Sequence, residues 1–129
     1  MMKLLRLLFL LPVIAHAATY QESAMLPVHS TLMTPGKVVS RPVQLPGLTP
    51  LFILGDDKLS RAWLRQRLPV LRQLRAIGLV VQVETPKALA QLRQLSSGLT
   101  ISPVSADDLA QRLDLHHYPL LIVNGQIEQ

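Results

Sequence analysis

The chain of 129 residues contains no cysteine, and only 4% of its residues are aromatic. The absence of thiols excludes disulfide bonds, thiol catalysis and metal sites built on cysteine, so packing alone must hold the fold together. The sequence also has no glycine-rich phosphate loop and no Gly-x-Ser-x-Gly motif around a serine. These absences exclude thiol enzymes, nucleotide binders of the phosphate-loop type and serine hydrolases that carry this motif.

The first 17 residues have the three parts of a secretory signal peptide. Lys3 and Arg6 supply positive charge, residues 7–14 are apolar, and residues 15–17 have the small-x-small pattern that signal peptidase cleaves. The apolar part is too short to cross a hydrocarbon layer of about 30 Å, although an N-terminal membrane anchor or a buried helix is the alternative. We expect cleavage after Ala17, no membrane span in the mature chain, and export, most simply to a Gram-negative periplasm.

Removal of this segment changes the charge of the chain. The formal net charge falls from +5 to +3, because Lys3 and Arg6 leave with the signal peptide. A mildly basic mature chain does not predict a strong nucleic-acid binder. Its length is sufficient for one small domain with a core of its own.

Residues 18–49 form a proline-rich segment without a sustained helical or strand period. Prolines remove backbone hydrogen-bond donors and bias the preceding residues toward extended conformations. We expect an extended arm, partly disordered on its own, that docks along a partner or along the domain's own surface. A simple spacer is the alternative.

From residue 50 to residue 129, apolar strand patterns alternate with helical patterns. Strands are expected at 51–54, 79–83, 118–123 and 126–128, with a short strand at 98–101, and helices at 59–77, at 86–95 and from residue 105 onward. Thr85 followed by Pro86 indicates a helix start, and Asn124-Gly125 indicates a hairpin. This order predicts an α/β sandwich of three layers with a mixed sheet, parallel at its centre and antiparallel at its edge.

The first helix has an apolar side and a basic side. A helical wheel of this segment places six apolar residues on the side that faces the core, namely Leu59, Trp63, Val70, Leu71, Leu74 and Ile77. The opposite side includes Arg61, Arg65 and Arg72, which we take as candidate partner-binding residues, with a solvated face as the alternative. Pro69 is expected to kink or split this helix near Leu68.

The remaining candidates for chemistry are weak. Asp56 and Asp57 follow a buried strand, where active sites of α/β proteins gather, but a helix that begins there also needs an N-cap. His116 and His117 are adjacent, so on an extended chain they point in opposite directions and do not chelate one metal ion. We therefore expect no catalytic residue, no metal site, no cofactor and no small-molecule substrate.

One local feature suggests a particular scaffold. Pro119 begins a strand that follows a helix, and this arrangement resembles the cis-proline segment of thioredoxin-like domains. The resemblance implies a thioredoxin-like sandwich without redox chemistry, because the cysteines of that family are missing. An ordinary trans proline at the first residue of a strand is the alternative.

Five blocks of the sequence, residues 50–57, 60–64, 78–81, 102–109 and 117–119, together with the end at residues 127–129, are similar to a family of integrating conjugative element proteins. Members of that family are exported and are encoded among the conjugative type IV secretion genes of proteobacterial mobile elements. A more remote similarity is to the thioredoxin-like pilin-assembly proteins of F-type conjugation systems.

The resemblance implies a periplasmic, non-enzymatic accessory protein that contacts other proteins of the secretion apparatus during assembly of the channel or pilus. Two alternatives remain open: a thiol-independent chaperone or isomerase with a thioredoxin fold, and a weak DNA-binding module. No aromatic residues interleave with the arginines of the first helix, so binding of nucleic acid is not expected.

Overall fold

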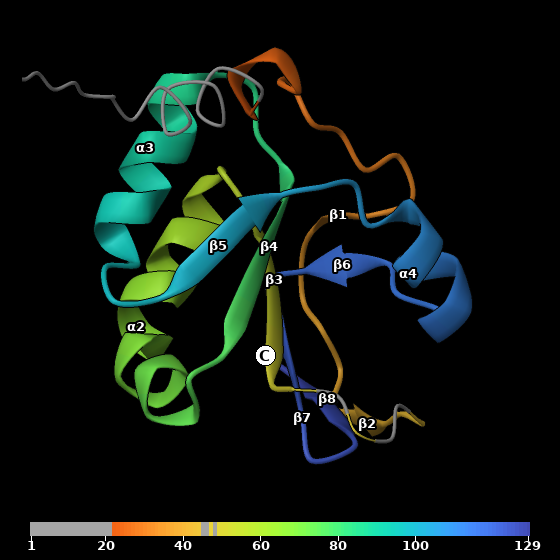
Figure 1. Cartoon of the computed structure of the whole chain (residues 1–129). Helices are drawn as coiled ribbons and strands as arrows, with labels where there is room; N and C mark the ends of the chain where they lie inside the picture. The colour runs from red at the N-terminus through yellow and green to blue at the C-terminus, as the bar shows by residue number, and fades with distance from the viewer. Residues whose placement is uncertain (1–21, 45–46, 48) are drawn as a thin grey trace, which may run out of the picture.

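The computed structural model describes residues 22–44, 47 and 49–129 (Figure 1). The expected signal peptide and the cleavage site after Ala17 lie outside the described residues. Among the residues that are described, none of the helices has the length and apolar character required to cross a membrane.

A mixed sheet of six strands forms the middle layer of the molecule. In spatial order its strands are β2 (Arg41–Pro42), β8 (Gln126–Glu128), β7 (Leu120–Val123), β3 (Leu51–Gly55), β4 (Ile77–Gln82) and β5 (Thr100–Pro103). Strands β3, β4 and β5 are parallel, whereas β7 pairs with β3, β8 with β7 and β2 with β8 in antiparallel fashion. The predicted α/β class and the mixed sheet are confirmed.

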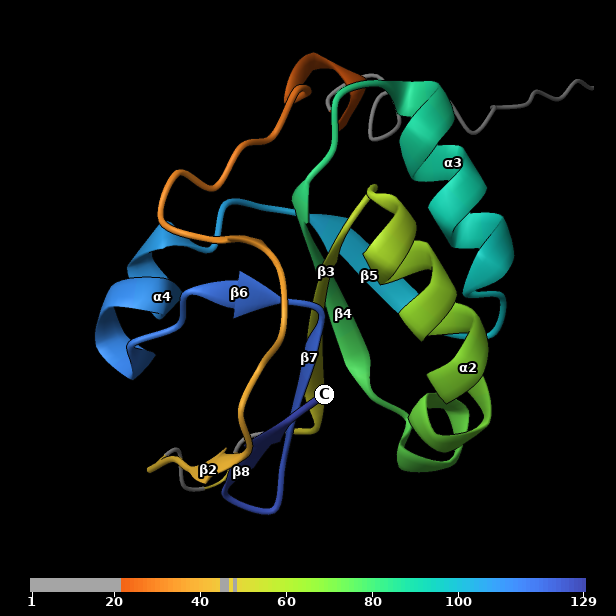
Figure 2. The same ribbon diagram turned by 180° about the vertical axis from the view of Figure 1, so that it is seen from behind.

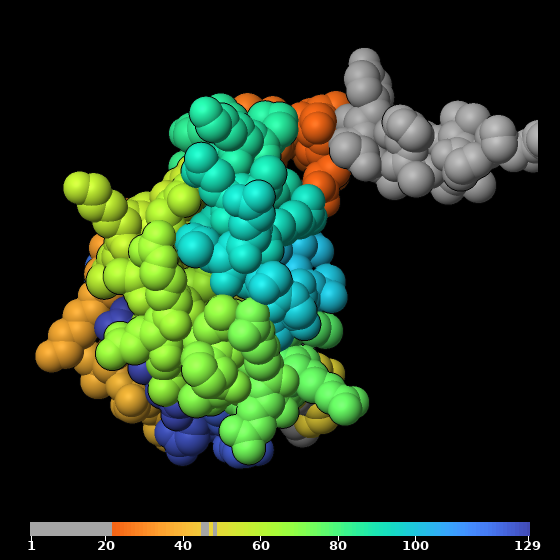
Figure 3. Space-filling model, turned by 90° about the vertical axis from the view of Figure 1, so that its left-hand side faces the viewer, coloured from red at the N-terminus to blue at the C-terminus, as the bar shows by residue number. Residues whose placement is uncertain are grey.

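Helices α2 (Lys58–Leu74) and α3 (Pro86–Leu95) cover one face of this sheet (Figures 1 and 2). Together they make up most of the surface on that side (Figure 3). Phe52 and Leu54 of β3 point toward them and join a core cluster with Leu64 and Leu71 of α2. The alternation of side chains along a strand sends Ile53 to the other face.

On that other face lie helix α4 (Asp107–Leu113) and a parallel pair of short strands, β1 (Thr34–Pro35) and β6 (His117–Tyr118) (Figure 2). They cover a second core cluster, which contains Ile53 and Val81 from the sheet. Because both faces of β3 and β4 are covered, these strands are apolar along almost their whole length rather than alternating with polar residues.

Helix α2 differs from the prediction in its length and its continuity. It ends at Leu74 rather than at residue 77, because Arg75 adopts a left-handed conformation with φ 52° and donates its N–H to the carbonyls of Arg72 and Leu71. The helix also runs without interruption through Pro69. Pro69 and the residue one turn before it, Arg65, are both exposed, so water can bond the carbonyl that the proline leaves without a donor.

The buried face of α2 is rotated relative to the predicted one. The helix buries Ser60, Trp63, Leu64 and Leu71. Leu59 and Val70, which were expected in the core, are 44% and 38% exposed, and Ile77 lies in β4 and is 41% exposed. The small side chain of Ser60 lets the helix start close to the backbone of Gly55, so contact with the sheet is centred on this side of α2.

The described part of the proline-rich segment packs on the domain itself. Val28 forms an isolated bridge with Val83 of the neighbouring chain segment, and both Val28 and Met33 are buried. Ser30 is buried as well, and its hydroxyl donates to the carbonyl of Val81 and accepts from the N–H of Ala106. Of the expectations for this segment, docking on the domain's own surface is the arrangement observed.

The segment is also part of the β-structure, because β1 pairs with β6 and β2 pairs with β8. Each of these two strands is only two residues long, which explains why no strand period is visible in the sequence. Residues 22–44 and 50–129 therefore share both core clusters, and residue 50 does not separate two independently packed parts.

Most of the predicted helix starts and turns are present. The hydroxyl of Thr85 caps α3 by accepting from the N–H of Ala88 at 3.1 Å. Asn124 and Gly125 both have positive φ angles and join β7 to β8 in a hairpin. The helix expected from residue 105 onward is α4, which begins at Asp107 and has no side-chain cap.

The strand predicted at residues 118–123 is divided into two. Pro119 separates β6 from β7, and the Tyr118–Pro119 peptide bond is cis, which is the isomer expected from the sequence. A second cis bond precedes Pro27. Because of the division, β6 pairs with β1 while β7 joins the central sheet.

Candidate binding pocket

The polar residues between β3 and α2 are used to start the helix. The carboxylate of Asp57 accepts from the N–H of Ser60 at 2.9 Å and from its hydroxyl at 2.8 Å. The Ser60 hydroxyl in turn accepts from the N–H of Gly55 at 2.9 Å. The N-cap role expected for this Asp-Asp pair is therefore confirmed, and Asp57 performs it.

Asp56 and Tyr118 complete this edge of the sheet. Asp56 accepts from the N–H of Glu84 at 3.3 Å through its side chain and from Nε of Arg61 at 2.9 Å through its carbonyl. The ring of Tyr118 packs so closely on Gly55 that a Cβ at that glycine would lie 2.7 Å from it. Burial, with the negative charges of Asp57 and Asp56 as further causes, raises the pKa of Tyr118 to about 12.

The three arginines taken as candidate partner-binding residues lie along α2. Arg61 donates to the carbonyl of Asp56, and the guanidinium of Arg72 donates to the carbonyl and the hydroxyl of Ser97 at 2.8–3.0 Å. Arg65 is exposed. Two of the three thus also stabilise neighbouring segments, and their use by a partner remains a prediction.

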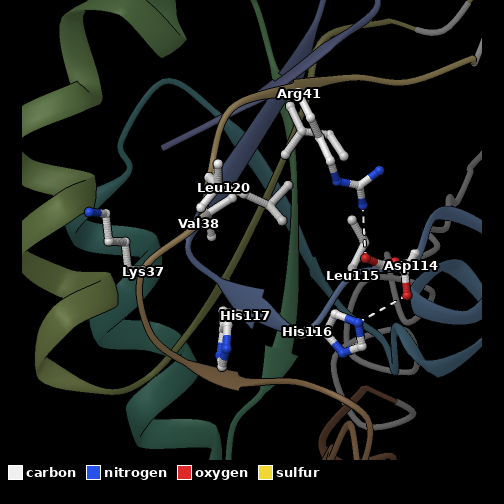
Figure 4. A pocket seen from close by; sticks show the side chains of 10 residues that line it. Lys37, Val38, Arg41, Asp114, Leu115, His116, His117 and Leu120 are labelled. Carbon is white, nitrogen blue, oxygen red and sulfur yellow. Dashed lines mark hydrogen bonds and ion pairs between the residues drawn. The ribbon is translucent and has the colours of Figure 1, made fainter.

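A pocket of about 210 Å³ lies on the opposite side of the sheet, between the proline-rich segment, the end of α4 and the hairpin of β7 and β8 (Figure 4). Its inner wall is apolar and consists of Val38, Leu115, Leu120 and Ile127. Leu115, Leu120 and Ile127 are almost completely buried and form the floor of the pocket, whereas Val39, which also lines it, is 72% exposed. The described proline-rich segment therefore builds one wall of the pocket.

The rim of the pocket is polar and mostly basic. Arg41 donates to the carbonyl of Leu113 and to that of Asp114, the latter drawn in Figure 4, and these bonds tie the proline-rich segment to the end of α4. The ring of His116 lies 2.9 Å from the carboxylate of Asp114. Lys37 lies on the outer side of the pocket. Asp114, the only carboxylate among the described residues that line the pocket, thus already lies beside an imidazole.

The two adjacent histidines contact different partners. His117 lies 3.2 Å from the hydroxyl of Thr34 in β1, whereas His116 contacts Asp114. Among residues 22–44, 47 and 49–129, no three histidine or carboxylate side chains are grouped in a way that could hold a metal ion.

A carboxylate outside the pocket fixes the segment that precedes it. Asp107 accepts from the N–H of Leu32 at 3.0 Å and from the N–H and hydroxyl of Thr31 at 3.2 and 2.9 Å. These bonds hold the pKa of the Asp107 carboxyl below its usual range, and the bond from the N–H of Leu32 has the largest effect. The first turn of α4 therefore anchors the chain on its way to the pocket wall.

A second depression runs along the outer flank of α2, with a volume of about 530 Å³. The exposed Leu59 and Val70 line it together with Trp63 and Arg67. Arg67 donates to the carboxylate of Glu128 in β8 at 2.8 Å. Within the described chain, Nε1 of Trp63 and Nε of Arg67 are buried and have no hydrogen-bond partner.

Sequence reasoning did not find the basic pocket. Its walls come from residues 37–41, residues 114–117, β7 and β8, which only the folded chain brings together. The sequence carries one signal for this pocket, the pair His116 and His117 before Pro119, because both side chains line it.

Comparison with known proteins gives one relationship. Residues 11–127 match the family described as protein of unknown function (DUF2859). Neither the curated proteins nor the solved structures contain a match to the chain. Since the matched range extends over most of the sequence, the chain belongs to the DUF2859 family.

Proposed function

We propose that this protein is a non-enzymatic accessory protein of the type IV secretion system of an integrating conjugative element. It is exported through its N-terminal signal peptide, cleaved after Ala17, and acts in the periplasm by contact with other proteins of the apparatus. The signal pattern of residues 1–17 supports export. The sequence blocks that are similar to conjugative element proteins support the assignment to this secretion system.

We further propose that the domain has a thioredoxin-like scaffold. The order of β3, α2, β4 and α3, followed by the hairpin of β7 and β8, supports this assignment. Pro119 leads the strand of the hairpin, as in the cis-proline segment of that scaffold, and Tyr118 before it packs on Gly55 at the end of the first strand.

The observation that supports a mechanism of protein contact rather than catalysis is that the polar groups of Asp57, Ser60 and Gly55 at this edge hydrogen-bond one another. The Asp57 carboxylate and the Ser60 hydroxyl bond each other, and Ser60 also accepts from Gly55. A nucleophile or general base needs an atom that can reach a substrate, whereas Ser60 is fully buried. The basic pocket on the other face instead offers a preformed surface for a binding partner.

The test removes the gene from a donor strain that carries the intact element and measures transfer frequency. We expect transfer to fall and to be restored by the wild-type gene, but not by a matched gene that lacks codons 2–17. N-terminal sequencing of the periplasmic protein should begin at Ala18. Undiminished transfer after deletion, or rescue by the form without a signal peptide, would contradict the proposal.

A further inference from the structure

We propose that the pocket between the proline-rich segment and the hairpin of β7 and β8 binds one large apolar side chain from an acidic segment of a partner protein. This inference rests on the proposed function in one respect, namely that the partner is a protein. It adds where the partner binds and which chemistry the pocket recognises.

The apolar wall defines the first part of the recognised group. Val38, Leu115, Leu120 and Ile127 come from three separate segments and face one cavity of about 210 Å³. A cavity of about 150 Å³ with an apolar lining is large enough to bind benzene. The pocket therefore has room for one aromatic ring or one leucine side chain, and not for a helix or a folded surface.

The rim defines the charge of the occupant. Lys37 and Arg41 are cationic, and the single carboxylate of the lining, Asp114, lies 2.9 Å from His116. Lys37 forms no ion pair with another described residue. Its side chain points away from Arg41 and His116 (Figure 4), so its flexible stem has to turn toward the mouth for the ammonium group to meet a carboxylate there. Charge complementarity consequently favours carboxylates beside the apolar side chain.

The depression along α2 is the main competitor for such a segment. It is larger, and it exposes Leu59 and Val70. The guanidinium of Arg67, which lines this depression, already pairs with the carboxylate of Glu128. The depression therefore has no comparable preference for an acidic occupant. The experiment therefore has to distinguish the two places.

The probe is the peptide acetyl-Gly-Asp-Phe-Asp-Gly-amide, added to the chain of residues 18–129 with methyl groups labelled for NMR. We expect shifts at Val38, Leu120 and Ile127. A peptide with alanine in place of phenylalanine should bind at least about tenfold more weakly, because the ring no longer enters the apolar pocket. A peptide with lysines in place of the aspartates should also bind more weakly.

The protein variant Lys37→Glu should weaken binding of the acidic peptide about two- to fivefold, as expected for an exposed charge pair. Lys87→Glu is the matched control, because Lys87 is an exposed lysine on α3, on the opposite face of the sheet, and should leave binding unchanged. Both variants alter exposed side chains, and their melting temperatures should equal that of the wild type.

Shifts at Leu59 and Val70 instead of the pocket methyl groups would overturn the proposal, as would equal binding of the lysine peptide or no binding at all. These outcomes do not depend on conjugation. Failure of the peptide to bind, together with loss of transfer after gene deletion, would refute only the pocket. Specific binding in the pocket with unchanged transfer would refute only the proposed function.

Discussion

Replacing Met33 by alanine tests whether the proline-rich segment is part of the folded core. Met33 is 3% exposed and packs in the cluster that contains Ile53 and Val81 of the central strands. Truncation of a buried methionine to alanine typically costs about 2–5 kcal/mol of unfolding free energy. For a domain of this size each kcal/mol lowers the melting temperature by about 4 °C or more, so we expect a decrease of roughly 8–20 °C.

The matched control is Met25→Ala, because Met25 belongs to the same segment and is 57% exposed. Its unfolding free energy should change by less than about 0.5 kcal/mol. Urea unfolding can be followed by the fluorescence of Trp63, the only tryptophan of the chain, which is buried. Equal stabilities of the two variants would refute the conclusion that residues 22–44 are part of the core.

Three further predictions concern the edge of β3 and its neighbours. Asp57→Ala should lower the unfolding free energy by about 0.5–2 kcal/mol in urea titrations, and Asp57→Ser, which retains a capping oxygen, should lose less; equal losses would contradict the cap. The pKa of Tyr118 is raised to about 12 in the folded chain, so its contribution to the unfolding free energy is present below pH 10 and declines as the pH rises toward 12. In thermal melts across this pH range, Tyr118→Phe should show a smaller decline of the melting temperature than the wild type. Gly78→Ala should cost about 1–3 kcal/mol, since a Cβ there would collide with the ring of Phe52, and a double variant with Phe52→Leu should lose less than the sum; an unchanged melting temperature would refute this packing.

Signals that involve neighbouring residues were read correctly from the sequence. The cap of α3 at Thr85 and the hairpin at Asn124-Gly125 depend on hydrogen bonds and φ angles within a few residues. The apolar run of β3 indicates a strand that is covered on both faces, whatever covers it. The interactions behind such features are made within one short segment, so they favour the same local structure whether or not the rest of the chain has folded.

Helix α2 shows where local reasoning was insufficient. The wheel placed Leu59 and Val70 in the core, but contact with the sheet is centred on Ser60 and Leu64. On this side the Ser60 hydroxyl accepts from the N–H of Gly55 at 2.9 Å, a contact with β3 that the helical period does not contain. Pro69 was expected to divide the helix, yet it lies on the exposed side, where water can compensate for the missing donor.

The sequence by itself determined the α/β class, the approximate places of the strands and helices, and the signal-like N-terminus. Only the tertiary structure decided that the proline-rich segment supplies Met33 to the core and one wall of the pocket. Strands of two residues leave no periodic pattern in the sequence. The stability that each buried side chain contributes depends on partners that are distant in the sequence. The basic pocket therefore exists only after residues 37–41 have docked beside residues 114–117, because no single segment contains both its apolar wall and its charged rim.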